Sequence, residues 1–223
     1  MNKFTEAFDG LMLGDGCITK SKMHKNYHYA QPCNCLEWVS SIKNLFINNG
    51  FNSTITEVKP NLLHYIPKPN YSYTLQSNYT EFFTNQHNRW YIKDYNIDEY
   101  PKKNWHLDED NEEYFAWHKT VPEDIILTPI CVLNWYLGDG SLIDPKYYNH
   151  KYINISTCSF YESELKQLVF LLNDYIVDCA YFKKSDNHIQ ISTNNGVKSF
   201  LNYINYLNIP NCYYYKFKDE VII

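Results

Sequence analysis

The pattern of apolar and polar residues divides the chain into two halves that share one order of elements. Apolar residues at helical spacing predict helices, and short alternating or β-branched runs predict strands. The first half gives helices at 5–13, 36–48 and 80–91 and strands at 17–20, 27–31, 53–58 and 71–76. The second gives helices at 128–137, 161–175 and 197–207 and strands at 141–143, 152–157, 177–183 and 188–193. The order α-β-β-α-β-β-α, present twice, predicts a duplicated domain and not a solenoid.

Capping residues support several of these helix ends. Thr5 and Thr128 stand where the N-caps of the first helix in each half are expected. Ser159 and Glu162 have the spacing of a capping box before the helix at 161–175. Gly16 follows the first helix and suits a left-handed position there.

The charges are distributed unevenly and suggest three segments. Residues 1–93 hold 9 basic and 6 acidic residues, residues 94–124 hold 3 and 10, and residues 125–223 hold 8 and 9. The middle segment alone carries a charge of −7 against −5 for the whole chain, and it has no counterpart in the second half. We interpret 1–93 and 125–223 as the two repeats. Residues 94–124 are interpreted as an acidic, aromatic-rich solvated connector, with a partner-binding insert as the alternative.

Composition excludes several classes of protein. Hydrophobic residues make up 44% of the 223 positions, which excludes wholesale disorder. No apolar run approaches the ~20 residues of a membrane-spanning helix, and the first residues lack the pattern of a secretory signal. The seven cysteines are scattered, so we expect reduced thiols and an intracellular, reducing location, with an organelle of AT-rich genome as one setting.

Two short motifs at the ends of the first helix of each half contain the candidate chemistry. Residues 8–16 and 132–140 both end in Gly-Asp-Gly. Small or short residues recur four positions apart, as Gly10 and Gly14 in the first motif, so they share a helix face. Such a face lets two helices approach closely, which would place Asp15 beside Asp139.

Two carboxylates brought together in this way need a counter-charge. Each lies at the negative end of a helix dipole, and the two repel each other. A divalent cation with hard oxygen ligands resolves both problems, which favours Mg²⁺ over softer metals. A metal held by Asp15 and Asp139 is typical of phosphodiester cleavage.

With these residues in view, the sequence resembles the LAGLIDADG homing endonucleases of the single-chain, two-repeat branch. The resemblance lies in the two motifs and in matching flanks, including 118–122 and 126–129 before the second motif, 156–160 before the next helix, and 209–210 with 215–217 near the C-terminus. It covers nearly the whole chain except 94–118, and its wider match is to intron-encoded mitochondrial enzymes.

The resemblance implies an α+β fold of two pseudo-symmetric αββαββα domains. Their four-stranded antiparallel sheets would form a saddle over the major groove of DNA, with the motif helices at the domain interface. It also implies a monomeric endonuclease that hydrolyses both strands of a long duplex target with Mg²⁺ or Mn²⁺ and leaves staggered ends.

The resemblance assigns roles to individual residues. Asp15 and Asp139 match its metal-binding acids. Lys119 and Lys216 match its basic residues beside each scissile phosphate, and Gln31 matches a water-positioning amide. The resemblance also places Gly14 and Gly138 among the metal-binding residues. Cys158 stands at the place expected to correspond to Gln31, which predicts unequal cleavage of the two strands.

We expect base and phosphate contacts from alternating strand residues and their flanking lysines. The predicted DNA-binding residues are Lys20, Lys22, Lys25, His28, Lys59, Tyr73 and Gln76 in the first half, and Lys146, Lys151, Asn154, Lys183, Lys184, His188 and Gln190 in the second.

Two other functions stay open. The same fold could bind intron RNA as a non-cleaving splicing maturase, although retention of both acids and both lysines favours cleavage. A protein-interaction module that uses the acidic segment has no motif to support it. The near-neutral charge outside 94–124 lacks the basic excess that nucleic-acid binders usually show.

Overall fold

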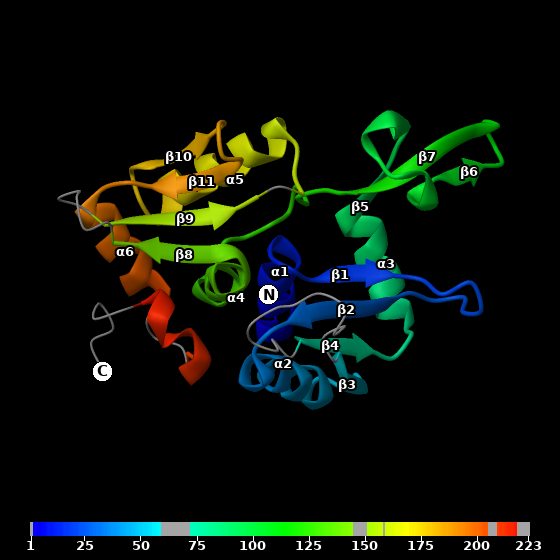
Figure 1. Cartoon of the computed structure of the whole chain (residues 1–223), viewed down its shortest axis with the longest axis horizontal. Helices are drawn as coiled ribbons and strands as arrows, with labels where there is room; N and C mark the ends of the chain where they lie inside the picture. The colour runs from blue at the N-terminus through cyan, green and yellow to red at the C-terminus, as the bar shows by residue number, and fades with distance from the viewer. Residues whose placement is uncertain (1, 59–71, 145–150, 158, 205–208, 218–223) are drawn as a thin grey trace, which may run out of the picture.

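A computed structural model describes residues 2–58, 72–144, 151–157, 159–204 and 209–217, and it confirms the predicted α+β fold with antiparallel sheets. Figure 1 shows two halves arranged around a central pair of helices, α1 and α4. The predicted calls at Lys59, Lys146 and Cys158 lie outside the described residues.

The first half forms one four-stranded antiparallel sheet in the order β1-β2-β4-β3. Its elements are α1 (Lys3–Leu13), β1 (Cys17–Thr19), β2 (His28–Cys33), α2 (Leu36–Asn48), β3 (Ser53–Val58), β4 (Ser72–Ser77) and α3 (Glu81–Trp90). Residues of one strand parity, such as Tyr29 and Leu75, are fully buried against the helices. Because side chains alternate along a strand, the residues between them form the opposite, open face of the sheet.

The second half repeats this arrangement in the order β10-β11-β9-β8. Its elements are α4 (Pro129–Asp139), β8 (Gly140–Ile143), β9 (Tyr152–Ser156), α5 (Glu162–Tyr175), β10 (Ala180–Lys183), β11 (His188–Ile191) and α6 (Asn194–Ile204), followed by the 3₁₀ helix η3 (Asn211–Lys216). In Figure 1, β1 and β8 lie beside the α1/α4 pair, and β3 and β10 form the outer edges.

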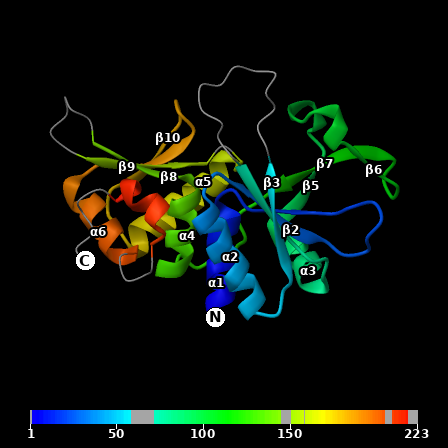
Figure 2. The same cartoon turned by 60° about the horizontal axis from the view of Figure 1, so that its bottom comes forward.

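The acidic middle segment is more ordered than the predicted connector. Strand β5 (Tyr91–Asp94), at the end of the first repeat, forms a separate antiparallel sheet with β6 (His106–Asp108) and β7 (Glu113–Lys119) of this segment, in the order β5-β7-β6. The 3₁₀ helices η1 (Ile97–Glu99) and η2 (Lys102–Asn104) lie between β5 and β6. Both views show this sheet extending away from the two larger ones (Figures 1 and 2). Sequence reasoning missed it because its strands are short and its charged residues hide the alternation.

Three local predictions need correction. The N-cap of α1 is Asn2, whose side chain accepts from Phe4 N–H, and not Thr5. The capping box of α5 begins at Tyr161, because the Glu164 carboxylate accepts from the Tyr161 N–H at 2.6 Å. Gly16 has no positive φ; a Cβ there would lie 2.6 Å from the Tyr29 hydroxyl oxygen, so close packing requires the glycine. The predicted N-cap Thr128 is confirmed.

The close packing predicted for the motif helices is present. A Cβ placed on Gly10 would lie 2.1 Å from the carbonyl oxygen of Cys131 in α4, so α1 and α4 touch through main-chain atoms. Nearer the helix ends, a Cβ on Gly14 would lie 3.6 Å from the Cα of Gly138. Figure 2 shows the two helices side by side at the centre of the molecule. This contact aligns their carboxyl ends.

Arg89, the single arginine of the chain, is committed to an internal ion pair. Its Nη atoms donate to both oxygens of Asp9, at 2.5 and 3.0 Å, and Asp9 is fully buried in α1. Its Nε also donates to Asp124, whose side chain is 71% exposed. The Arg89 guanidinium thus joins α3 to α1 through the bidentate contact with a carboxylate that arginine favours.

Replacement of Arg89 by Met should lower the free energy of unfolding by about 3–5 kcal/mol, because the Asp9 carboxylate would be left buried without a partner. Asp124→Asn is the matched control and should cost less than about 1 kcal/mol, since its pair with Arg89 is solvent-exposed. Chemical denaturation of both variants measures the difference, and equal losses would contradict this assignment.

The expectation that the cysteines are all reduced thiols is wrong for one pair. Cys35 at the start of α2 and Cys212 in η3 form a disulfide that joins the two halves. Glu37 reinforces the join, because its carboxylate accepts from the N–H groups of Asn211 and Cys212. The 177 residues that separate the two cysteines explain why spacing gave no hint of the pairing.

Across the described residues, no helix combines the length and apolarity needed to cross a bilayer.

Candidate active site between the motif helices

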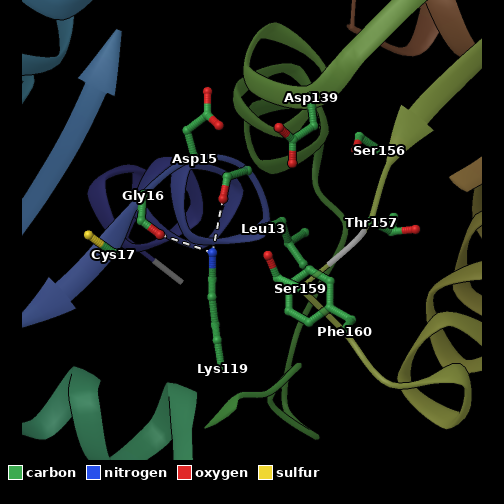
Figure 3. A pocket seen from close by; sticks show the side chains of 11 residues that line it. Leu13, Asp15, Gly16, Cys17, Lys119, Asp139, Ser156, Thr157, Ser159 and Phe160 are labelled. Atoms are coloured by element: carbon green, nitrogen blue, oxygen red, sulfur yellow. Dashed lines mark hydrogen bonds between the residues drawn. The ribbon is translucent and has the colours of Figure 1, made fainter. Parts of the chain in front are cut away.

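Asp15 and Asp139 stand at the adjacent ends of α1 and α4, as predicted. Figure 3 shows both side chains on the same side of the helix pair. A Cβ on Gly138 would lie 3.5 Å from the Asp15 backbone nitrogen and 4.0 Å from its Oδ2, so the first carboxylate lies against the end of the second helix. Asp15 is exposed and Asp139 is half-buried.

The two carboxylates differ in their environments. Burial, and after it the charge of Asp15, together raise the pKa of Asp139 to about 7, although Lys119 and Lys216 oppose the change. A carboxylate whose pKa is raised in this way lacks sufficient counter-charge. The site therefore has the electrostatics of a cation-binding centre.

Lys119 extends from the end of β7 to the end of α1. Its Nζ donates to the carbonyl oxygens of Gly14 and Gly16, each at 2.9 Å (Figure 3). These are carbonyls that the helix leaves without an internal partner, and the helix dipole there favours a cation. Burial lowers the pKa of Lys119 to about 8, although Asp139 and Asp15 favour the charged form.

Lys216 makes the corresponding contact with the end of α4. From η3, its Nζ donates to the carbonyl oxygens of Tyr136, Leu137 and Gly138, at 3.3, 2.7 and 3.3 Å. Burial again lowers its pKa to about 8. The three contacts can use all three ammonium protons, whereas the two contacts of Lys119 leave one proton available for another partner.

Two cavities flank the acid pair, one beside each lysine. The cavity of about 340 Å³ beside Lys119 is lined by Asp15, Asp139 and polar residues of the second half, Ser156, Thr157 and Ser159. The cavity of about 360 Å³ beside Lys216 is lined by Asp15, Gly138 and residues that include Asn34, Tyr213 and Tyr215. Each combines a lysine, the end of one motif helix and the end of the second strand of the opposite half.

Comparisons with known proteins bear on this arrangement. No family model matches the sequence, and the search of curated proteins returns no match. Among solved structures, the homing endonuclease I-WcaI bound to its DNA recognition sequence superposes with a TM-score of 0.66 at 20% identity, covering 96% of this chain and 85% of that one. The chain has the LAGLIDADG fold.

Other structures with the LAGLIDADG fold agree. The N-terminal LAGLIDADG domain of DUF199/WhiA gives a TM-score of 0.54 at 13% identity, covering 99% of this chain and 87% of that one. I-DmoI in complex with DNA and Mn gives 0.50 at 12% identity, covering 93% of this chain and 98% of that one. At these identities the likeness establishes the fold.

The strand register of the two LAGLIDADG sheets changes which residue of the second half corresponds to Gln31. Cys17 pairs with Ala30 in the first half and Ser141 pairs with Asn154 in the second. The equivalent of Gln31 is therefore Ile155 and not Cys158. Gln31 is 2% exposed, faces the helices, accepts a hydrogen bond from the Tyr29 hydroxyl and lines neither cavity.

The predicted DNA-binding residues separate into three groups. Gln76, Asn154, Lys183 and His188 share the open faces of the LAGLIDADG sheets. His28 and Gln190 lie on the same faces but are only 7% and 8% exposed, and the Gln190 amide oxygen accepts a hydrogen bond from the Tyr181 hydroxyl. Lys20, Lys22, Lys25, Lys151 and Lys184 lie just beyond strand ends. Tyr73 is misassigned, because its strand parity matches Leu75 and its ring packs against the core.

Sequence reasoning missed the cavity-lining residues of the opposite half, such as Asn34 and Ser156. Each follows or ends the second strand of its half, so the duplication contained the signal. Residues 156–160 contributed to the family resemblance, but neither Ser156 nor Asn34 was assigned a role in the site.

Proposed function

We propose that this chain is a site-specific, divalent-metal-dependent endonuclease that binds duplex DNA and cuts both strands. The observation that supports this proposal is the pair of Asp15 and Asp139, with one lysine beside each helix end and one cavity on either side. Two equivalent cavities around one acid pair suit two scissile phosphates. Since both halves belong to one chain, we propose that it acts as a monomer and leaves staggered ends.

The donor set fits a hard cation. Asp15 and Asp139 supply carboxylate oxygens, which Mg²⁺ and Mn²⁺ prefer. Burial and the charge of Asp15 raise the pKa of Asp139, and a bound cation would oppose both effects. The carbonyls of Gly14 and Gly138, also predicted as ligands, accept from the two lysines. When bound, the cation would supply charge stabilisation at the phosphate and a more acidic water.

The residues of the chain then have distinct tasks. Lys119 lies in its cavity with one ammonium proton available to donate to a phosphate oxygen, which would stabilise charge that develops during cleavage. Lys216 is held by three carbonyls and keeps the end of α4 in place beside Asp139. The polar residues Ser156 and Asn34, on opposite sides, can orient water or backbone oxygens.

The direct test uses the purified chain and the intron-free form of the locus that encodes it. Incubation with Mg²⁺ should give a double-strand break at one position, mapped by sequencing both ends, and chelation should abolish it. A chain that never cuts but binds intron RNA tightly would instead indicate the maturase.

Replacement of each lysine tests the two cavities separately. Lys119→Met should slow cleavage of one strand by about 10²-fold, the cost of removing one charge-stabilising donor, and yield nicked plasmid. Lys216→Met should affect the other strand, together with a lower unfolding temperature. Lys198→Met, at an exposed position on α6, is the control. Equal slowing of both strands by Lys119→Met would contradict the assignment of one lysine to each strand.

A further inference from the structure

We propose that the open faces of the two sheets select duplex DNA rich in A·T pairs over G·C pairs in the segments they cover. This inference rests on the proposed function and names its substrate more closely. The pairing of the strands determines which side chains lie on the open faces. The proposal follows from the side chains that are present there and from those that are absent.

Cross-strand pairing arranges the open faces in rows. In the first half, one row runs Cys17, Ala30, Gln76, Thr54 across β1, β2, β4 and β3. In the second, the equivalent row runs Ser141, Asn154, Gln190, Tyr181. Directly paired residues point to the same side of a sheet. Gln76 and Gln190 therefore occupy equivalent positions in the two halves.

The chemistry of these rows matches adenine and thymine. A side-chain amide can donate and accept at once, which suits the N6 and N7 groups of adenine. A further row of the first sheet contains Thr74 and Thr56, whose methyl groups can contact the thymine methyl. Gln76 and both of these threonines are at least partly exposed.

The chemistry that reads guanine is scarce on the same faces. Guanine offers two acceptors to the major groove, and arginine is its best partner. The single arginine of the chain is bound to the buried Asp9. Within the described strands, the one lysine on an open face of the two large sheets is Lys183, which is paired with Asp186 at 2.5 Å.

Two polar atoms on the second sheet lack partners in the free protein. The Oδ1 of Asn154 and the Nε2 of His188 are buried and make no hydrogen bond. Both residues lie on the open face, in adjoining rows. Buried polar atoms are normally satisfied, so these two indicate groups that a bound partner completes. A free acceptor at Asn154 suits the N6 amino group of adenine.

The test is selection from a library of duplexes with a randomised segment, bound by the full chain without divalent cation and then sequenced. We expect A·T pairs to exceed G·C pairs by on the order of tenfold at several positions in each half-site. Enrichment of G·C, no base preference, or no binding to any duplex would overturn the proposal. Selected duplexes that bind with this preference but resist cleavage in Mg²⁺ would refute the nuclease and leave the A·T inference standing.

A variant locates the preference on the sheet. Gln76→Arg at an exposed position should convert one selected position from A·T to G·C, with about a tenfold change in relative affinity. Asn44→Arg, which adds the same charge on the exposed side of α2, is the matched control and should leave every preference unchanged. If the wild type and Gln76→Arg selected the same sequence, Gln76 would not contact a base, and the assignment of this row to the DNA-facing side would be wrong.

Discussion

Replacement of Asp139 by Asn should reduce cleavage by roughly 10³-fold or more and leave DNA binding nearly unchanged. The variant keeps the shape of the site but loses one of the two carboxylates that would hold the proposed cation, and electrostatic stabilisation of this kind accounts for large factors in rate. Asp15→Asn should have the same effect. Plasmid cleavage and gel-shift affinity measure the two properties independently, with Asp98→Asn in the exposed η1 as the control.

Asp139→Asn should impair cleavage but should not lower the stability of the fold. The pKa of Asp139 rises to about 7 on folding from an ordinary value of 3.8. The folded state therefore binds more protons than the unfolded state between these values, and stability falls as pH rises through this interval. Without divalent cations at pH 8, Asp139→Asn should unfold at or above the wild-type temperature, whereas added Mg²⁺ should raise the wild-type temperature alone. A clearly less stable variant would indicate a structural role for the carboxylate.

Gly10→Ala should be the most damaging single-methyl substitution at the helix interface, lowering the free energy of unfolding by about 3 kcal/mol. Its Cβ would lie 2.1 Å from the Cys131 carbonyl oxygen, a main-chain atom that cannot move without α4. The resulting separation of the helices would also part Asp15 from Asp139 and impair cleavage. Urea denaturation and plasmid cleavage measure the two losses.

Gly138→Ala provides the control for this prediction. It places the same methyl group in the same interface, but its Cβ would contact Asp15 N at an ordinary 3.5 Å. We expect a change of less than about 1 kcal/mol, because helix propensity offsets part of the crowding. Comparable losses from both variants would show that crowding at Gly10 is not what limits the approach of the helices.

The sequence predicted those parts of the fold that local patterns determine. The bounds of α2 and β3 agree with the structure, and the motif helices pack as the small residues at i and i+4 required. The sheet of the middle segment was missed because a few paired residues per strand give too little periodicity. Its fold depends on tertiary contacts such as the pair between Lys93 and Asp108.

The candidate site divides in a similar way. The juxtaposition of Asp15 with Asp139 followed from the duplicated motif, because its small residues at i and i+4 predict close packing of two equivalent helices. The contacts of the two lysines did not, because Lys119 and Lys216 reach their helix ends from β7 and η3 across long stretches of sequence. Tyr73 and Gln76 were both predicted to contact DNA, although residues three positions apart on one strand point to opposite faces. The role of Gln31 came from the resemblance, and the register places its side chain toward the helices.

The glycine contact between α1 and α4 has a consequence for how such a protein could diversify. Main-chain atoms set the spacing of the two acids, so that spacing is independent of the side chains on the open face of either sheet. Half of this chain is exchangeable for the corresponding half of another protein with the LAGLIDADG fold, provided that the incoming helix has equally small residues at the shared surface. Recognition could then evolve one half at a time while the chemistry at the junction is inherited intact.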